Sequence, residues 1–477
     1  MKKEVVKMQT PLKEKAKIRT KNKVNTKVYK INPSLKNLGK GKKYFIKTYG
    51  CQMNVHDTEN IKAILEQMNY KPASSMENAD LILLNTCAIR ENAHSKVFGM
   101  IGRIKHMKEN NPSLIAGICG CMAQEEGVVN DILKKYNFLD IVFGTHNIDE
   151  LPYILEKSIK SKTLEVWVYS CEGDIVEDIP VKRDSKYKAW INIMYGCDKF
   201  CTYCIVPYTR GKQRSRNPKD IIREIEKLKE DGYKEVTLLG QNVNAYGKDL
   251  DIDYDMSNLL KDISNIGIER IRFITSHPWD FTDKMIDVIA SKENIMPYIH
   301  LPLQSGSDRI LKLMGRRYTK DSYLKLYNKI KSKIKNVSIT TDIIVGFPGE
   351  TEEDFKETLD VVEKCKYDSA FTFIFSPREG TPASKMKDEI SLKEKEERLY
   401  KLNEIVNKYA KEANEKYLGK TVKVLLENVS SKKKGYLSGY TETMKLVNVK
   451  ASKKNIGKIV DVEITNVQTW SLDGKMV

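Results

Sequence analysis

The sequence predicts an α/β protein with three domains: an N-terminal parallel α/β domain, a partial TIM-like (βα)6 barrel, and a small antiparallel β-barrel of the OB-like type. A length of 477 residues suits about three domains. Strand-like and helix-like segments alternate from residue 43 to about residue 385. Short strand-like segments separated by glycine turns fill the C-terminal end. The expected domains cover residues 43–161, 183–413 and 416–477.

The charge of the chain is concentrated at its two ends. Residues 1–40 carry 13 Lys and Arg against 2 Asp and Glu, and residues 416–477 carry 12 against 5, which together account for the formal net charge of +18. These basic ends predict a polyanionic partner, and nucleic acid is favoured over a membrane because no basic amphipathic helix with an aromatic face is evident. A merely solvated lysine-rich surface is the alternative. Residues 1–42 lack steady apolar periodicity, so we expect a disordered extension there.

The composition also bears on the cellular compartment. No apolar run approaches the ~18 residues of a membrane-spanning helix, and the lysine-rich start has no signal-peptide core. The nine cysteines are an odd number, which disfavours a disulfide framework. We therefore expect a cytoplasmic protein, a monomer without membrane contact, whose thiols can bind metal.

In the N-terminal domain, three apolar segments each end close to a cysteine. Segments 44–50, 81–86 and 114–118 precede Cys51, Cys87 and Cys121, and helices are expected over 57–68 and 91–110. The spacing suits one strand plus one return helix, which would place the cysteines at the same end of neighbouring parallel strands. They predict a cluster site with three thiol ligands, and three unrelated buried cysteines are the alternative. Cys121 is preferred to Cys119 because it stands at the exit of its strand.

A second cysteine triad lies within one loop. Cys197, Cys201 and Cys204 form a CxxxCxxC segment after a strand expected over 190–195. Three thiolates at this spacing can hold three corners of a 4Fe-4S cluster and leave one iron open to a substrate or cofactor. A zinc site is the alternative, but zinc takes a fourth protein ligand and no further Cys or His lies nearby in the sequence.

Residues 188–385 predict six strand–helix units, three-quarters of a TIM-like barrel. The strands are expected over 190–195, 235–239, 270–275, 298–301, 338–345 and 369–375. The working loops of such a barrel lie at the C-terminal ends of its strands, and polar segments fall there. They predict a pocket that faces the loop triad, with candidate cofactor-binding residues Gln241, Asn242, Ser276, Gln304, Ser305 and Gly306. Loops that only turn the chain are the alternative.

A charged helix expected over 392–417 leads into the C-terminal barrel. Short strands are expected over 421–426, 435–440, 446–449 and 458–466, an arrangement often used to hold RNA. Lys432, Lys433 and Lys434 are expected to contact phosphates. A structural cap is the alternative for this domain. Three arginines follow the cluster loop: Arg210, Arg214 and Arg216. They are expected to contact a cofactor carboxylate or an RNA phosphate, and ordinary ion pairs within the protein are the alternative.

These motifs resemble the radical S-adenosylmethionine (SAM) superfamily and, within it, the methylthiotransferases. The resemblance covers about residues 43–477 and rests on segments 48–54, 85–93 and 195–211, which contain Cys51, Cys87 and the loop triad. It implies an upstream cysteine domain, a partial barrel and a terminal TRAM domain. It also implies SAM and two 4Fe-4S clusters, an auxiliary one on Cys51, Cys87 and Cys121 and a radical SAM cluster on Cys197, Cys201 and Cys204.

The resemblance implies a specific chemistry. The open iron binds SAM, reduction yields a 5′-deoxyadenosyl radical, and a methylthio group enters C2 of a prenylated adenosine next to the anticodon of a tRNA. The auxiliary cluster supplies sulfur and a second SAM supplies the methyl group. No side chain need act as a general base, so His277 and His300 are expected to line the pocket or support the fold. The implied partners are tRNA, an electron donor such as flavodoxin or ferredoxin, and a sulfur donor.

Related activities stay open as alternatives. After its first cysteine the chain has Gln52, Met53 and Asn54, whereas the sibling acting on ribosomal protein S12 usually has Pro-Lys-Asn and the sibling acting on threonylcarbamoyladenosine in tRNA has Lys-Val-Asn. These residues favour the prenylated adenosine. A non-catalytic iron-sulfur protein that binds RNA or transfers electrons is the alternative from another class.

Overall fold

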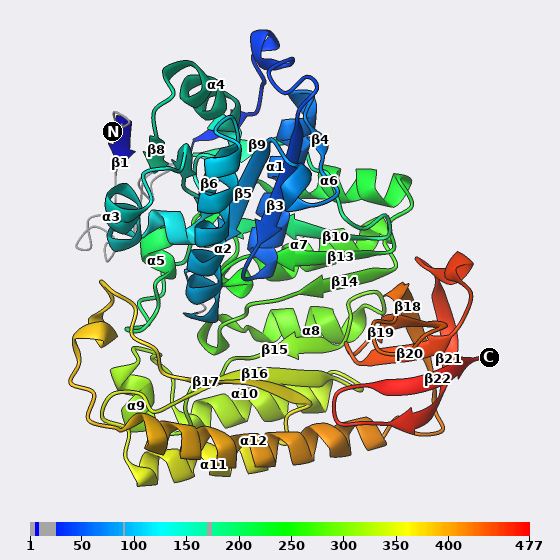
Figure 1. The fold of residues 1–477 in the computed structure, drawn as a ribbon. Helices are drawn as coiled ribbons and strands as arrows, with labels where there is room; N and C mark the ends of the chain where they lie inside the picture. Colours follow the sequence, from blue (N-terminus) through cyan, green and yellow to red (C-terminus); the bar gives the residue numbers. More distant parts are fainter. Residues whose placement is uncertain (1–4, 9–24, 89–90, 169–173) are drawn as a thin grey trace.

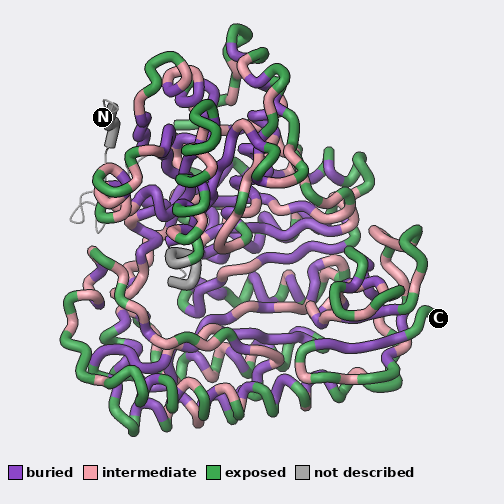
Figure 2. The backbone as a smooth tube through the Cα atoms, viewed as in Figure 1, coloured by how far each residue is buried: buried purple, intermediate pink, exposed green. Residues whose placement is uncertain are grey.

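The computed structural model describes residues 5–8, 25–88, 91–168 and 174–477. Figure 1 shows the N-terminal domain on one side of the central barrel, the long helix α12 (Leu392–Glu415) along the opposite side, and the C-terminal β-barrel against one end of the strands. Figure 2 shows buried residues concentrated along the strands, whereas green exposed stretches follow the outer turns of the helices. Among the described helices, none is both long and apolar enough to cross a membrane.

The N-terminal domain is built on a seven-stranded parallel sheet. Its strand order is β1 (Val5–Met8), β8 (Glu165–Val168), β7 (Ile141–Phe143), β6 (Ile115–Gly120), β5 (Leu81–Thr86), β3 (Lys43–Thr48) and β4 (Lys71–Pro72). All residues of the central strand β5 are buried, as expected for a parallel strand covered on both faces. Apolar residues of α1 (Gln52–Gln67) and α4 (Leu151–Ser161) pack on one face, and those of α2 (Glu91–Asn110) and α3 (Glu126–Lys135) pack on the other.

The N-terminal segment is more ordered than the disordered extension expected over residues 1–42. Strand β1 completes the edge of the sheet next to β8, and β2 (Thr26–Val28) pairs with β9 (Ile175–Glu177). The short helix η2 (Pro33–Leu35) is capped by Asn32, whose Oδ1 accepts from the Ser34 N–H at 3.1 Å. Both strands find partners that are remote in sequence, so local periodicity carried no signal for them. The rest of that expectation, on residues 1–4 and 9–24, lies outside the described residues.

The boundary of the N-terminal domain also differs from the expected residue 161. Strand β8 lies between the first two expected domains, yet it pairs with β7 and belongs to the first sheet. The sheet therefore extends to residue 168. Glycine, proline and charged residues in the segment between these domains obscure the pattern of this short strand, which is fully buried.

The six expected strands of the partial barrel are present as two parallel three-stranded halves. One half contains β10 (Lys188–Asn192), β13 (Glu235–Leu239) and β14 (Arg270–Phe273), and the other contains β15 (Tyr298–His300), β16 (Ser338–Val345) and β17 (Ser369–Ile374). A bridge between Ile271 and Ile295 connects them. One face of each strand packs in the largest apolar core under the surrounding helices: α6 (Pro218–Glu230), α7 (Met256–Ile266), α8 (Asp283–Ser291), α10 (Lys320–Lys333), α11 (Glu352–Cys365) and α12. The alternate residues line the lumen.

The C-terminal domain is a closed five-stranded barrel, as expected. Its order is β18 (Thr421–Val429), β19 (Tyr436–Thr441), β20 (Leu446–Lys450), β22 (Leu472–Met476) and β21 (Ile459–Val467). The pairing is antiparallel, as expected, except at one seam, where β20 and β22 run parallel. The last strand must close the barrel beside a strand of the same direction, which short-range patterns do not reveal.

The C-terminal barrel is fastened to the N-terminal ends of the central strands. The buried Arg270 donates to the Tyr440 carbonyl at 2.9 Å and to the Lys423 carbonyl at 3.0 Å. Arg272 donates to the carbonyls of Thr441 and Glu442, each at 2.8 Å. These contacts make the C-terminal barrel part of the support of the central barrel.

Candidate metal centres and cofactor site

The three dispersed cysteines meet at one edge of the N-terminal sheet. Cys51, Cys87 and Cys121 follow β3, β5 and β6, which are adjacent strands. The Oδ1 atom of Asn54 lies 3.7 Å from the Sγ atoms of both Cys51 and Cys121. Gly50 permits this approach, since a Cβ there would lie 2.3 Å from the Cβ of Cys87.

Electrostatic effects within this triad confirm how close the thiols lie. A hydrogen bond with Cys87 lowers the pKa of Cys51 to about 6 against the effect of burial, and the positive charge of Arg210 acts in the same direction. Burial raises the pKa of Cys121 to about 11. Cys119 points into the apolar core on the α1 and α4 face instead.

The loop triad follows the short strand β11 (Met194–Tyr195). The helix α5 (Val206–Thr209) comes directly after the triad, and the short strand β12 (Arg214–Ser215) comes after the helix. The backbone N–H of Lys199 donates to Cys197 Sγ at 3.4 Å, and Nη1 of Arg316 donates to Cys201 Sγ at 3.3 Å. Burial and the neighbouring Cys201 raise the pKa of Cys204 to about 12. Ionisation of the Cys204 thiol is therefore disfavoured without a cationic centre beside it.

The chemistry of both triads fits a cubane iron-sulfur cluster. Each offers three thiols together with N–H donors aimed at sulfur, which is how proteins bind and tune such clusters. Among the residues that the structure describes, no group of three such side chains is arranged around a single metal ion.

One cysteine of the first triad packs beside the loop of the second triad, across the domain boundary. Ala88 and Cys121 of the N-terminal domain pack in one apolar cluster with Ile205 of the loop that carries Cys204, and Tyr208 packs against it. Arg210, directly after α5, reaches the same place with its guanidinium. The sequence separated the two sites by 76 residues, from Cys121 to Cys197, and only the fold brings them together.

The expected cofactor-binding residues divide into two groups. Four of them are committed to bonds inside the protein: Asn242 Nδ2 donates to Asp280 at 2.7 Å, Ser276 donates to the His300 carbonyl, Ser305 Oγ lies 3.4 Å from Thr358 Oγ1, and the Gly306 N–H donates to the same oxygen at 2.9 Å.

Gln241 and Gln304 form the second group. The Nε2 atom of Gln241 contacts the Met53 sulfur of the N-terminal domain. Gln304 has a left-handed backbone, with φ of 70°, and its N–H donates to the Asp342 carbonyl at 2.8 Å. These two amide side chains stay candidates for direct contact with a cofactor.

A basic and aromatic surface beside the loop triad escaped the sequence analysis. The half-exposed Trp279 ring has Lys199 Nζ at 5.3 Å and the Arg317 guanidinium carbon at 5.9 Å from its centroid. Burial would raise the pKa of Asp280 nearby, but hydrogen bonds from Lys199, Lys248 and Asn242 outweigh it and lower the pKa to about 2. The signal was available as a lysine inside the cluster loop, yet Trp279 and Arg317 lie 80 and 118 residues further on.

Beside His300, which was expected to line the pocket or support the fold, lie two phenylalanines that the sequence did not single out. His300 Nε2 lies 3.2 Å from Asp342 Oδ2, and the Phe371 ring lies 6.1 Å from the His300 ring. Phe371 and Phe373, on the outer strand β17, are 53% and 45% exposed, which is high for large apolar residues. Their spacing of two is the strand signal that could have identified this face.

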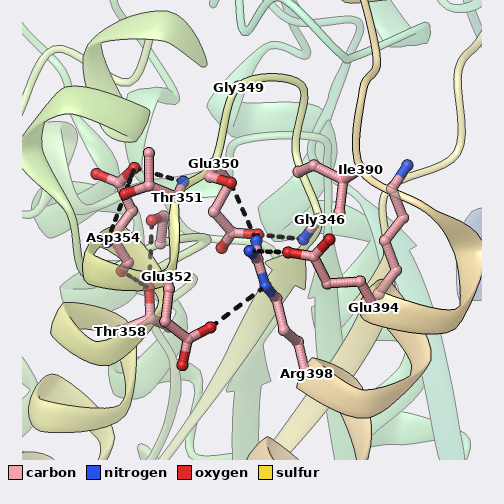
Figure 3. A network of polar contacts seen from close by, with 12 residues as sticks. Gly346, Gly349, Glu350, Thr351, Glu352, Asp354, Thr358, Ile390, Glu394 and Arg398 are labelled. Carbon is pink, nitrogen blue, oxygen red and sulfur yellow. Dashed lines mark hydrogen bonds and ion pairs between the residues drawn. The ribbon is translucent and has the colours of Figure 1, made fainter.

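The segment after β16 forms a polar network with α12 (Figure 3). The Glu350 carboxylate accepts hydrogen bonds from the Gly346 N–H and from Arg398 Nη1. Glu394 also accepts from Arg398, on its Nη2. This network fixes the turn at the strand end that faces the candidate pocket.

The arginines and lysines expected to bind RNA behave differently from one another. Arg210 and Arg216 are buried, and Arg216 pairs with Glu177 at 2.6 Å and Glu224 at 2.9 Å. The guanidinium of Arg214 packs over Tyr195, 5.9 Å from its ring centroid. An RNA-phosphate role is thus corrected to internal contacts for these three arginines, because burial of a guanidinium requires a paired partner.

The three lysines are less buried than these arginines. Lys432 and Lys434 are exposed. Lys433 forms an ion pair with Asp473 at 2.6 Å.

Comparisons with known proteins agree with this architecture. The chain matches the family models of the Uncharacterized protein family UPF0004 over residues 43–144, the Radical SAM superfamily over 191–362 and the TRAM domain over 415–477. The solved structure of the radical SAM methyltransferase TsrM from Kitasatospora setae covers 72% of this chain, with 75% of that chain covered, 12% identity and a TM-score of 0.51. That similarity concerns the fold alone.

Curated relatives match over nearly the whole chain. The tRNA-2-methylthio-N(6)-dimethylallyladenosine synthase of Staphylococcus epidermidis is 55% identical over 471 residues, covering 98% of this chain and 92% of the relative. The enzyme of that name from Bacillus subtilis is 56% identical over 450 residues, covering 94% and 88%. The chain therefore belongs to the family of the tRNA-2-methylthio-N(6)-dimethylallyladenosine synthases, within the radical SAM superfamily.

Proposed function

We propose that this protein inserts a methylthio group at C2 of N6-dimethylallyladenosine 37 in tRNA. The observation that carries the proposal is the contact between two three-cysteine sites, one on each of two domains, where Ala88 and Cys121 pack against Ile205. A reaction that places sulfur on an unactivated carbon needs a radical source and a sulfur source close together.

The six cysteines are proposed to hold the two clusters. Cys197, Cys201 and Cys204 would hold the radical SAM cluster, and Cys51, Cys87 and Cys121 the auxiliary cluster. When bound, the radical SAM cluster would supply the electron that cleaves one SAM, the auxiliary cluster would supply the sulfur, and a second SAM would supply the methyl group.

Other residues around the two triads are proposed to stabilise the thiolates, keep water out of the site and contact SAM. Arg316 and the Lys199 N–H stabilise thiolate charge on the loop triad. Tyr208, packed with Ala88, covers the contact between the triads and keeps water out. The side chains of Gln241 and Gln304 are proposed to contact SAM at the strand ends.

The tRNA is proposed to contact the exposed Lys432 and Lys434 of the TRAM domain through its phosphates. An electron donor such as flavodoxin or ferredoxin and a separate sulfur donor complete the proposed partners, and the working unit is proposed to be a monomer.

The test compares anticodon stem-loops with and without the dimethylallyl group, supplied to the reconstituted protein. An apolar pocket for that group gains about 0.8 kcal/mol for each buried methylene-sized unit, so the prenylated RNA should be favoured about tenfold or more in kcat/KM. SAM cleavage without RNA serves as the control for cluster loading. Equal turnover of both RNAs, or activity only on a threonylcarbamoyl-modified loop or on ribosomal protein S12, would reassign the substrate.

A further inference from the structure

Arg210 links the loop of one cysteine triad to a thiol of the other. It follows Cys204 by six residues, yet its guanidinium lies inside the N-terminal domain and the residue is only 4% exposed. Its Nε donates to Cys121 Sγ at 3.1 Å, and its Nη2 donates to Asn54 Oδ1 at 2.9 Å and to Asp57 Oδ2 at 2.7 Å.

The Asn54 amide is held rigidly, so the guanidinium has little freedom. Its Nδ2 donates to the Tyr49 carbonyl at 3.1 Å and to the Thr86 carbonyl at 2.8 Å. Asn85 donates to the Asn54 carbonyl at 2.8 Å. With both Nδ2 hydrogens in use, the Oδ1 atom is fixed toward Arg210 and the thiols.

Asp57 balances the charge of the guanidinium. Both side chains are buried, and a buried cation without a partner is strongly disfavoured. The ion pair fixes one edge of the guanidinium, and the Nε–H on another edge points at Cys121. A charge-assisted N–H bond to a cluster ligand stabilises the more negative, reduced state of the cluster.

We propose that Arg210 is a positioning residue that raises the reduction potential of the auxiliary cluster through its Nε–H bond to Cys121 and holds that cluster at a fixed place beside the loop triad. This inference rests on the proposed function, since it requires a cluster on Cys51, Cys87 and Cys121. Arg210 belongs to the radical SAM domain, so the bond also couples the orientation of the two domains to the electronic state of the auxiliary cluster.

The test is a redox titration followed by electron paramagnetic resonance. It uses the full chain with Cys197→Ala, Cys201→Ala and Cys204→Ala, in which only the auxiliary cluster remains. Arg210→Gln removes the cation and leaves Asp57 facing the cluster, so the potential should fall. Arg210→Lys keeps the charge but loses the planar donor, so the potential should fall less. Asp57→Asn keeps the donor and removes the opposing charge, so the potential should rise.

The opposite signs of the Arg210→Gln and Asp57→Asn shifts separate an electrostatic effect from general loosening of the site. Arg216→Gln is the matched control, because Arg216 is also buried and paired but its partners are Glu177 and Glu224, and it should leave the potential unchanged.

An unchanged potential in Arg210→Gln, or shifts of the same sign in Arg210→Gln and Asp57→Asn, would overturn the proposal. If the Arg210→Gln variant loses its iron, the potentials of the Arg210→Lys and Asp57→Asn variants test the proposal. Unchanged potentials in both of these variants would overturn the proposal. Absence of iron from the parent triple variant would instead contradict the proposed function.

Discussion

The Glu350 carboxylate and the Arg398 guanidinium form a buried ion pair, with Arg398 Nη1 3.0 Å from Glu350 Oε2 (Figure 3). Glu350 also accepts from the N–H of Gly346, at the end of β16, while Arg398 comes from α12. The pair therefore connects the turn at a working strand end to a helix on the outside of the barrel.

Removal of Arg398 should destabilise the protein strongly. Arg398→Ala leaves the Glu350 carboxylate buried without its cation, which costs about 3–5 kcal/mol of the free energy of unfolding. Urea denaturation of the apoprotein measures this. Lys401→Ala, at an exposed position on the same helix, is the matched control and should stay within about 0.5 kcal/mol of the parent. A loss for Arg398→Ala no larger than that of Lys401→Ala would contradict the importance of the pair.

Iron content should divide between the two triads. The anaerobically purified protein should hold about eight irons, and the Cys197, Cys201 and Cys204 triple alanine variant about four. The corresponding variant of Cys51, Cys87 and Cys121 should still cleave SAM but install no sulfur.

Iron analysis and detection of 5′-deoxyadenosine provide the readouts for both variants. Cys365→Ala, a buried thiol of α11, should keep all the iron. Bound zinc, or full iron in either triple variant, would refute the assignment.

Lysines of the C-terminal barrel should control tRNA affinity. The double variant Lys432→Ala and Lys434→Ala should weaken binding and reduce the slope of log affinity against log salt by about 2, since each lysine releases about one counterion. Binding titrations at several salt concentrations test this. The exposed Lys356→Ala on α11 is the control. An unchanged slope would show that these lysines do not contact phosphate.

Deletion of residues 417–477 would be a poor substitute for these point variants. Arg270 and Arg272 donate to four carbonyls of the C-terminal barrel, so the deletion would remove these four acceptors and leave Arg272 only its bond to the Glu235 carboxylate. We expect such a truncated protein to lose central-barrel stability as well as RNA binding.

Acid should destabilise the boundary between the first two domains. Burial, with the charge of Arg183 adding to it, lowers the pKa of His56 to about 3, and its neutral Nδ1 lies 3.1 Å from Asn192 Nδ2. Because the unfolded chain takes up the proton near pH 6.5, this contribution is complete above that pH and is lost as the pH falls toward 3, by up to about 1.4 kcal/mol per unit. His56→Gln should flatten the pH dependence of unfolding over this window, and an unaltered profile would exclude His56 as its source.

The sequence by itself determined the six strands of the central barrel, strands β3, β5 and β6 of the N-terminal sheet, and the six candidate cysteines, but not strands β1, β2 and β8. Strands β5, β13 and β16 begin and end at the predicted residues, because segments rich in apolar and β-branched residues between polar turns are local signals. The place of Cys51, Cys87 and Cys121 followed from parallel-strand topology, in which every carboxyl end falls at the same edge.

Only the tertiary structure decided which charged groups serve the site. Arg210 and Arg216 look alike in sequence, yet one reaches Cys121 and the other pairs with Glu177 and Glu224. A guanidinium acts according to the acceptors around it, and these include Cys121 and Glu177, which lie 89 and 39 residues away from their arginines in the sequence. Local patterns fix the backbone of an element, whereas the partner of a long side chain is set by domain packing, which the order of residues along one segment does not encode.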